Sequence, residues 1–350
     1  MFSSFFQELS EKLSMDGIQV INFSLKQENS YCEQNGVNIH YDKRHGLVSN
    51  YVAIYKIIKR VQPDVIISNF SYINPAILFG KLFGVKTNIA WFHTAFGHTK
   101  PNILKVWNKS IYLNMADIVL TNSKSLQNEM HQVYKVAEER TRRIPFWTTI
   151  ENYGSDANAF PISKHSDIIN IGCPGRLLTN KNQKVVIKAL HQLKQMSHKD
   201  VRLYIAGDGA NKIQLEALVT VLGLKHEVIF LGVLNANGMA SFYKAMNVVV
   251  LPSLHEAFGL VFIEAIALGT PVLVSNTFGA LDFVDSQEFS LEDFCFDPQS
   301  IQELINKLEP YLLNKGLSKD YFKSMYDKTF EKEAIYQQIK SIILNQKSPS

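Results

Sequence analysis

Two glutamates, Glu256 and Glu264, stand eight positions apart in a stretch whose residue types suit a phosphorylated ligand. The apolar, β-branched run Val248–Leu251 before them predicts a buried strand, and Leu260–Leu268 predicts a helix closed by Gly269. Backbone N–H groups at the start of such a helix lack partners and attract phosphate. Because Glu256 precedes that start and Glu264 lies about one turn inside the helix, the pair predicts a binding site for a sugar nucleotide.

A second loop with phosphate-binding chemistry follows the predicted strand Ile168–Cys173. Gly175 allows a sharp turn, Arg176 can contact a phosphate through two N–H donors, and Lys181 adds a mobile point charge. Two cations between a strand and a helix suit a departing diphosphate. Taken alone, a surface turn with two solvated cations is the simpler interpretation.

Two further features have weaker chemical meaning. The turn Gly207-Asp208-Gly209 fails the dinucleotide fingerprint, because position 212 is lysine, but it leaves room for a base or ribose beside the backbone. His93 ends the predicted strand Thr87–Phe92, and a lone histidine there is more often structural than catalytic. His93 and His98 lack both helical metal spacing and a neighbouring carboxylate, so we predict no metal.

The elements that must position these residues alternate between strands and helices, which predicts parallel sheets covered on both faces. The predicted strands are Ile18–Phe23, Val65–Ser68, Thr87–Phe92, Ile118–Thr121, Arg143–Phe146, Ile168–Cys173, Arg202–Ala206, Val228–Leu231, Val248–Leu251 and Val272–Val274. The chain opens with the predicted helix Ser3–Ser14, although a doubly wound domain normally opens with a strand. The loss of that central strand would leave two neighbours unpaired, unless the N-terminus is incomplete or another segment fills the gap.

The bulk composition is that of a globular protein with two domains: 350 residues, 46% hydrophobic and 19% charged. No apolar run reaches the roughly 18 residues of a membrane span, and the N-terminus lacks the basic start of a signal peptide. Cys32, Cys173 and Cys295 form neither a disulfide framework nor a zinc pattern, which fits a reducing cytoplasm. We therefore expect a cytoplasmic protein.

The excess positive charge lies in the first half. Residues 1–160 carry 17 Lys and Arg against 13 Asp and Glu, whereas residues 161–350 carry 19 of each. The basic residues that flank Trp107 and Tyr112 or cluster beyond them are Lys100, Lys105, Lys109, Arg140, Arg142 and Arg143. They favour either peripheral contact with an anionic membrane or, more simply, ordinary solvated helix faces. Without a basic stripe interleaved with aromatics, we expect no nucleic-acid partner.

As a set, these motifs resemble the retaining glycosyltransferases of family 4, also called glycosyl transferases group 1. The resemblance runs from about Asp16 to the C-terminus and is strongest over residues 171–275. Its motifs are Gly175-Arg176-Leu177 with Asn180-Lys181, Ala206-Gly207-Asp208-Gly209, Phe230-Leu231-Gly232, Pro252-Ser253, Glu256 with Glu264, and Gly269-Thr270-Pro271-Val272. A weaker signal in the first half is Asp117-Ile118-Val119 with Asn122-Ser123. Where the family has a Gly-Gly-x-Pro-Glu-like stretch, this chain has Phe278-Gly279-Ala280-Leu281-Asp282.

The resemblance implies the GT-B fold, in which two Rossmann-like domains face each other across a cleft. We expect an acceptor-side domain over residues 1–155, a nucleotide-sugar-binding domain over 156–330, and a helix over 331–350 that crosses back to the first domain. The predicted linker is Glu151–Ser166. By the resemblance, Arg176 and Lys181 stabilise the diphosphate, Glu256 holds the donor sugar and His93 approaches it from the acceptor side. The implied substrate-binding residues are Glu264 for the ribose hydroxyls, Ala257, Phe258, Gly259 and Leu260 for the sugar, and Gly175, Gly209 and Leu231 for the turn and the base pocket.

The expected function is metal-independent transfer of a hexose-type sugar, with retention, from a UDP- or GDP-linked donor and without a cofactor. The expected acceptor is a glycan or a lipid-linked molecule of bacterial surface polysaccharide synthesis, such as lipopolysaccharide or capsule, at the inner face of the plasma membrane. The alternative is a catalytically impaired GT-B protein that binds nucleotide or a partner glycosyltransferase. An epimerase would need acid and base groups around the sugar ring, and a dehydrogenase would need the dinucleotide fingerprint. We find neither pattern.

Overall fold

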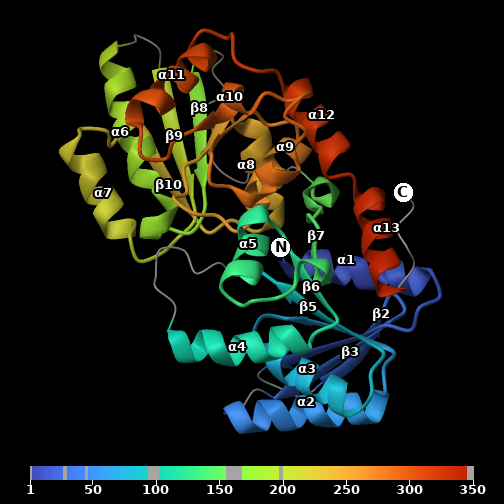
Figure 1. Ribbon diagram of the computed structural model, residues 1–350. Coiled ribbons are helices and arrows are strands. Elements are labelled where there is room, and N and C mark those ends of the chain that lie inside the picture. Colours follow the sequence, from blue (N-terminus) through green and yellow to red (C-terminus); the bar gives the residue numbers. More distant parts are fainter. Residues whose placement is uncertain are drawn as a thin grey trace. The chain divides into compact units, whose positions relative to one another are not determined.

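The computed structural model describes residues 2–26, 30–43, 46–93, 102–154, 168–196 and 200–344 (Figure 1). The chain divides into two compact units. Unit 1 comprises Met1–Phe146 with Lys332–Ser350, and unit 2 comprises Trp147–Glu331. His98, Lys100 and most of the predicted linker lie outside the described residues. Among the residues that are described, no helix is long and apolar enough to cross a membrane.

The main sheet of unit 1 is parallel and has the order β4-β5-β6-β7. Its strands are β4 (Val65–Asn69), β5 (Thr87–Phe92), β6 (Ile118–Thr121) and β7 (Thr141–Arg143). Every residue of β5 is buried, as expected of a parallel strand covered on both faces. The predicted strand Arg143–Phe146 is placed too late in the chain: β7 starts at Thr141, and Phe146 instead fills the core with an aromatic side chain.

A smaller sheet in unit 1 has the order β1-β3-β2. It contains β1 (Ile21–Lys26), β2 (Ser30–Gln34) and β3 (Val37–Lys43), with β1 parallel and β2 antiparallel to β3. The sequence prediction missed this hairpin, although Asn35 and Gly36 both adopt the positive φ of a tight two-residue turn.

The expectation of two strands without a second neighbour is confirmed within the described residues. β1 pairs only with β3, and β4 pairs only with β5. On β1, the backbone N–H of Leu25 instead donates to the hydroxyl of Tyr72 at 3.0 Å. A side chain therefore takes over one hydrogen bond that a neighbouring strand would have made.

The helices of unit 1 are α1 (Phe2–Met15), α2 (Leu47–Val61), α3 (Ile73–Leu82), α4 (Ile103–Met115), α5 (Lys124–Gln132) and α13 (Lys332–Ile343). α1 packs on the main sheet through Phe5, whose ring meets those of Trp91 and Phe146 edge-on at 5.7 and 4.7 Å. These rings are fully buried, so they anchor the N-terminal helix in the core of unit 1.

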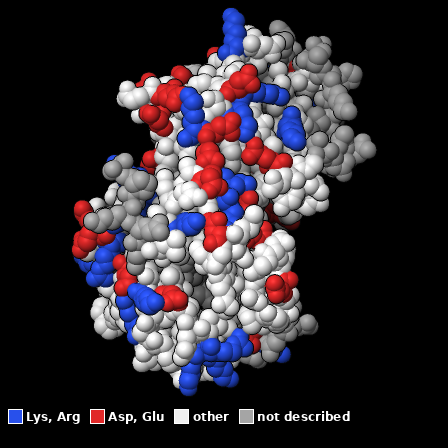
Figure 2. All heavy atoms as spheres, turned by 90° about the vertical axis from the view of Figure 1, so that its right-hand side faces the viewer, with Lys and Arg blue, Asp and Glu red and all other residues white. Residues whose placement is uncertain are grey.

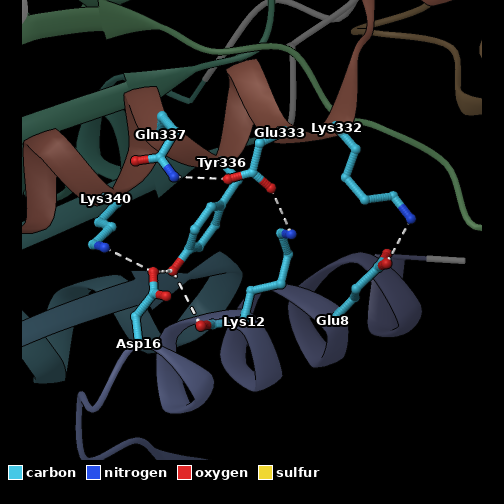
Figure 3. A network of polar contacts seen from close by, with 8 residues as sticks. All are labelled: Glu8, Lys12, Asp16, Lys332, Glu333, Tyr336, Gln337 and Lys340. Carbon is cyan, nitrogen blue, oxygen red and sulfur yellow. Dashed lines mark hydrogen bonds and ion pairs between the residues drawn. The ribbon is translucent and has the colours of Figure 1, made fainter.

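α13 lies along α1 although more than 300 residues separate the two helices in sequence (Figure 3). Lys12 pairs with Glu333 at 2.8 Å, and Lys332 pairs with Glu8 at 2.6 Å. The carboxylate of Asp16 accepts hydrogen bonds from Lys340, at 2.7 Å, and from Tyr336. The Lys340 and Tyr336 donors hold the pKa of Asp16 below its usual value. The C-terminal helix is thereby part of unit 1.

Unit 2 is built on a six-stranded parallel sheet with the order β10-β9-β8-β11-β12-β13. Its strands are β8 (Ile168–Pro174), β9 (Asp200–Ala206), β10 (Val228–Gly232), β11 (Val248–Leu251), β12 (Val272–Ser275) and β13 (Cys295–Phe296). Its helices are α6 (Gln183–Met196), α7 (Lys212–Val221), α8 (Ala236–Ala245), α9 (Leu260–Ala267), α10 (Leu291–Phe294), α11 (Ile301–Leu312) and α12 (Lys319–Thr329). Short 3-10 turns lie at Phe70–Tyr72 and Glu138–Arg140 in unit 1, and at Ile150–Asn152, Thr179–Lys181 and Gly279–Phe283 in unit 2.

The strand order of unit 2 reverses between β8 and β11. From β8 the chain adds β9 and then β10 on one side, and it then returns to add β11, β12 and β13 on the other. In open parallel sheets, ligands bind beyond the carboxyl ends of the strands at this point of reversal. The fold of unit 2 therefore predicts a binding site at the loops that follow β8 and β11.

Candidate functional site

The loops after β8 and β11 contain the cations and the first glutamate singled out in the sequence. β8 and β11 are direct neighbours in the sheet, so both loops leave its carboxyl edge side by side. A backbone hydrogen bond from Leu254 N–H to the carbonyl of Asn180, at 2.8 Å, ties the two loops together. This contact sets the distance between residues that are some 75 positions apart.

Lys181 and Glu256 form an ion pair across the two loops. Both side chains are less than one fifth exposed, so the pair is only partly screened by solvent. Arg176, in the same loop as Lys181, is exposed, and its guanidinium forms no ion pair with any other described residue. The site therefore offers one paired ammonium and one guanidinium at the edge of the sheet.

Backbone donors lie in the loop that contains Glu256. α9 begins at Leu260, and Gly259 before it has no capping side chain. Among the described residues, the N–H groups of Gly259, Leu260 and Val261 have no hydrogen-bond acceptor. Orphan N–H groups at a helix start, next to two cations, form an arrangement that suits a diphosphate.

The conformation of this loop depends on Gly259, whose φ is +102°. A Cβ atom at this position would lie 2.2 Å from a ring carbon of Phe278, so only glycine fits. The carbonyls of Glu256 and Phe258 accept from the N–H groups of Gly279 and Ala280, at 3.1 and 2.9 Å. The divergent stretch after β12 thus supports the loop before α9.

The residues predicted to hold the donor sugar differ in whether their side chains are accessible to a ligand. The side chain of Phe258 is buried, with its ring 6.2 Å from the rings of Phe283 and Phe330, so only its backbone is available to a ligand. Ala257 is half-buried, as is Leu260 at the start of α9. We conclude that this stretch can bind a ligand mainly through backbone groups.

The loops after β8, β9 and β10 are packed against one another by glycines. The N–H of Gly175 donates to Ala206 O at 2.8 Å, and the N–H of Gly207 donates to Gly232 O at 2.7 Å. Gly207 has φ +140°, and a Cβ on it would lie 2.0 Å from the carbonyl oxygen of Gly175. A Cβ on Gly209 would similarly approach Leu177 O to 2.5 Å. Leu231, the neighbour of Gly232 in β10, is partly exposed beside this junction.

Glu264 lies inside α9, and it is almost fully buried. Its carboxylate accepts a hydrogen bond from the hydroxyl of Tyr243, on α8, at 3.0 Å. Burial raises the pKa of Glu264 to about 8, and the Tyr243 hydrogen bond only partly offsets that rise. Burial and the nearby Glu264 also raise the pKa of Tyr243. Without a ligand, Glu264 therefore binds a proton near neutral pH.

His93 lies in unit 1, where β5 ends, within a buried polar cluster. Its Nδ1 lies 2.8 Å from Asn122 Oδ1, and its Nε2 lies 2.8 Å from the side-chain oxygen of Asn69. Asn69 ends β4 and Asn122 follows β6, so three neighbouring strands position the cluster. Burial lowers the pKa of His93 to about 4, so its imidazole is neutral near pH 7.

The orientation of Asn122 fixes the tautomer of His93. Asn122 Oδ1 also accepts from Trp91 Nε1 at 3.2 Å, and Asn122 Nδ2 donates to the carbonyl of Ile144 at 2.6 Å. Because this oxygen can only accept, His93 Nδ1 must carry the proton. Nε2 is then an acceptor, so a hydrogen bond between His93 and Asn69 requires the amide nitrogen, rather than the oxygen, of Asn69 to face the ring.

The other residues of the weak first-half motif have structural roles. Asp117 accepts from Lys81 at 2.5 Å and from the backbone N–H of Asn88 at 2.7 Å. Ser123 caps α5 through Leu126 N–H.

In unit 2, burial raises the pKa of the Cys173 thiol to about 12, so this thiol is no nucleophile near neutral pH. No group of three or more His, Cys, Asp or Glu residues in the described ranges is arranged to hold a metal ion.

Comparison with known proteins shows which family this chain belongs to. The model of the glycosyl transferases group 1 matches residues 156–328, and that of glycosyltransferase family 4 matches residues 3–147. The chain is therefore a member of the family 4 glycosyltransferases.

Among curated relatives, an uncharacterized glycosyltransferase of Methanocaldococcus jannaschii is 30% identical over 60% of this chain and 56% of its own length. The N-acetylgalactosamine-N,N'-diacetylbacillosaminyl-diphospho-undecaprenol 4-alpha-N-acetylgalactosaminyltransferase of Campylobacter jejuni is 27% identical over 62% of this chain and 59% of its own. The matches thus span less than two thirds of these relatives. Anabaena HepE, solved in complex with UDP, superposes with a TM-score of 0.77 at 18% identity, over 94% of this chain and all of its own, which shows that the fold is of the GT-B type.

Sequence reasoning gave no site role to two residues that contact predicted site residues. Tyr243 donates to Glu264, and Asn122 fixes His93. The position of Asn122 directly after a predicted strand was a usable signal, because the carboxyl ends of parallel strands gather polar site residues. Tyr243 had no such signal: it lies 21 positions before Glu264 in a separate helix.

Proposed function

We propose that this protein is a retaining glycosyltransferase that moves a hexose-type sugar from a UDP- or GDP-linked donor to a glycan or lipid-linked acceptor in surface polysaccharide synthesis. The observation that carries the proposal is the convergence of Arg176, Lys181, Glu256 and the orphan N–H groups of α9 at the reversal point of the unit 2 sheet. That position and that chemistry suit a nucleoside diphosphate.

In the proposed reaction the oxygen of an acceptor hydroxyl bonds to the anomeric carbon while the bond from that carbon to the diphosphate breaks. The diphosphate leaves with the bonding electrons and takes the proton of the acceptor from the same face, so the configuration is retained. Negative charge grows on the diphosphate, where Arg176, Lys181 and the α9 N–H groups would stabilise it. Preorganised donors of this kind usually supply the largest catalytic contribution.

The other site residues have narrower proposed roles. Glu264 would accept hydrogen bonds from the two ribose hydroxyls, and its carboxyl group must be ionised to accept both. Glu256 would hold the sugar while it keeps Lys181 in position. A contact between His93 and the sugar stays a prediction. A nucleotide in Anabaena HepE and an undecaprenol-linked substrate in the name of the Campylobacter relative support the donor and acceptor classes.

The test is a hydrolysis and transfer assay with a panel of UDP and GDP sugars, with the anomer of any product determined by NMR. Arg176→Ala should lower turnover about 100- to 1,000-fold, as loss of one preorganised donor does. Lys188→Ala, an exposed lysine on α6, is the matched control and should retain activity. Equal inertness of the wild type and Arg176→Ala across the panel would remove the main support for catalysis.

The second candidate is a GT-B protein that binds nucleotide, or a partner glycosyltransferase, without turnover. The observation that favours it is the split sheet of unit 1, in which β1 and β4 each lack a second neighbour among the described residues. Calorimetry with UDP and GDP separates the two candidates. Tight binding without hydrolysis or transfer would favour this alternative over the enzyme.

A further inference from the structure

The outer face of α4 is apolar, which is unusual for a helix that faces solvent. Ile103, Leu104, Trp107 and Ile111 are 83, 76, 65 and 40% exposed. Their spacing places them on one side of the helix, within about 100° of arc. A surface helix normally turns charged and polar residues outward, so this stripe requires an explanation.

α4 is held firmly, so the stripe is not the result of a frayed helix. Asn102 caps its start by accepting from the N–H groups of Leu104 and Lys105. At its end, Arg140 donates to the carbonyls of Asn114 and Ala116, at 2.6 and 3.2 Å. The opposite side of α4 is anchored by Leu113, which is fully buried.

The segment of the chain that contains α2, α3 and α4 is basic. Residues 46–116 contain eight Lys and Arg and a single acidic residue, Asp64, which pairs with Lys86 at 2.6 Å. The rest of the chain carries 28 basic against 31 acidic residues. The helices α2, α3 and α4 have no acidic side chain at all. The positive charge of the protein is therefore concentrated on this part of unit 1.

α2 is tied to α4 by a hydrogen bond between Tyr51 of α2 and Tyr112 of α4, and α3 packs against both helices. We call the exposed apolar and basic residues of the two helices the α2–α4 face: Val48, Val52, Lys56, Lys59, Arg60, Ile103, Leu104, Lys105, Trp107 and Ile111. Figure 2 shows Lys and Arg gathered, with few acidic neighbours, at the height at which Figure 1 places α2.

We infer that the α2–α4 face binds the surface of an anionic phospholipid bilayer. The apolar stripe would enter the boundary between headgroups and acyl chains, where Trp107 is especially suited, and the lysines would pair with lipid phosphates. A second copy of this chain is a poor occupant, because it would bring two basic, acid-free surfaces together. Lipid binding is independent of the transfer activity proposed above, so each can fail without the other.

The structure also narrows the set of basic residues that can take part. Lys109 turns inward and donates to the side chain of Asn74 at 3.1 Å, and burial lowers its pKa to about 8. Arg140 is committed to the end of α4, and Arg142 donates to the carbonyl of Glu139 at 2.7 Å. Lys109, Arg140 and Arg142 therefore already have partners within the protein, and we leave them out of the α2–α4 face.

Tryptophan fluorescence of the full chain offers a direct test. Of the three tryptophans, Trp91 and Trp147 are buried, so a change on lipid addition reports Trp107. Vesicles of equimolar phosphatidylglycerol and phosphatidylcholine should shift the emission to the blue and carry the protein upward in flotation. Vesicles of phosphatidylcholine alone should bind at least tenfold more weakly, and high salt should release the protein.

Variants identify the surface responsible. The double variant Trp107→Ala with Ile111→Ala should lower binding to the anionic vesicles at least tenfold, because it removes buried apolar area. Ile213→Ala, an equally exposed apolar residue on α7, should have no effect. Lys56→Glu with Lys59→Glu should weaken binding, unlike Lys184→Glu with Lys188→Glu on α6.

Three results would overturn the inference. The first is absence of binding, or equal binding to anionic and neutral vesicles. The second is an equal loss from Ile213→Ala and from the α4 double variant. The third is a dimer that the α4 double variant converts to a monomer in sedimentation velocity, which would assign the stripe to self-association.

Discussion

The variant Glu264→Gln separates two effects of the buried carboxyl group: its effect on the free energy of unfolding and its proposed contribution to nucleotide binding. In the folded protein, burial raises the pKa of Glu264 to about 8, whereas its ordinary value is 4.5. The folded state thus binds more protons than the unfolded state between these two pH values. The contribution of Glu264 to stability is fully present below about pH 4.5 and is lost as the pH rises through about 8.

The size of this effect follows from the two pKa values. At pH 7 the unfolded carboxyl is ionised and the folded one is mostly protonated, which costs the folded state about 3 kcal/mol at 1.36 kcal/mol for each pH unit above 4.5. Glutamine has the same shape, does not titrate and can still accept from Tyr243. We therefore expect Glu264→Gln to be more stable than the wild type at pH 7, by up to about 3 kcal/mol.

One assay measures the stability of Glu264→Gln, and a second measures its affinity for UDP. Urea unfolding at about pH 5 and about pH 8 should show that the stability advantage of Glu264→Gln grows with pH. Calorimetry of UDP binding in buffers of different ionisation enthalpy should show release of nearly one proton at pH 7 by the wild type and none by the variant. The variant should bind UDP about 10- to 150-fold more weakly, the loss expected for charge-assisted hydrogen bonds.

A stability difference that does not change with pH would refute the raised pKa of Glu264. Release of no proton by the wild type, with tight UDP binding intact, would instead refute the assignment of Glu264 to the ribose. Unfolding tests the raised pKa of Glu264 by itself, and once that pKa is established, proton release tests the proposed role of Glu264 at the ribose.

Three further predictions concern other parts of the two units. Gly207→Ala should cost more than about 3 kcal/mol in urea unfolding, because its Cβ would lie 2.0 Å from a backbone oxygen. Asn122→Ala should cost about 2–5 kcal/mol, since it leaves Trp91 and His93 without their acceptor, and ¹⁵N NMR of the imidazole should show that Nδ1 is no longer the preferred protonation site. Lys181→Ala should lower turnover about 100- to 1,000-fold, measured with the donor that the panel identifies.

The following control and outcomes would show whether each of these three predictions fails. Gly154→Ala, with no atom within 4 Å of the new Cβ, should be nearly neutral, and equal losses from both glycine variants would contradict the steric argument. If the wild-type imidazole were protonated at Nε2, the assignment of the His93 tautomer would be wrong. Unchanged turnover in Lys181→Ala would limit that lysine to holding Glu256.

Much of the fold of unit 2 could be predicted because its signals are local. Val248–Leu251 has the predicted bounds, since a continuous apolar run is visible within a few residues. The hairpin Ser30–Lys43 was missed because Ser30–Gln34 is polar and exposed along its whole length, although the alternation of Val37, Ile39 and Tyr41 with polar residues was a usable signal for the second strand. The strand predicted at Arg143–Phe146 was misplaced because buried aromatic residues beyond β7 imitate a strand.

The sequence by itself determined which residues have the chemistry: two cations in one loop, a glutamate on each side of a helix start, and glycines where the backbone must turn. Only the tertiary structure decided how they act on one another. It paired Lys181 with Glu256 through the adjacency of β8 and β11, and it buried Glu264 against Tyr243. The reason is physical: residue type sets charge and hydrogen-bonding capacity, whereas distance and burial, which set pKa and pairing, depend on contacts between segments far apart in the chain.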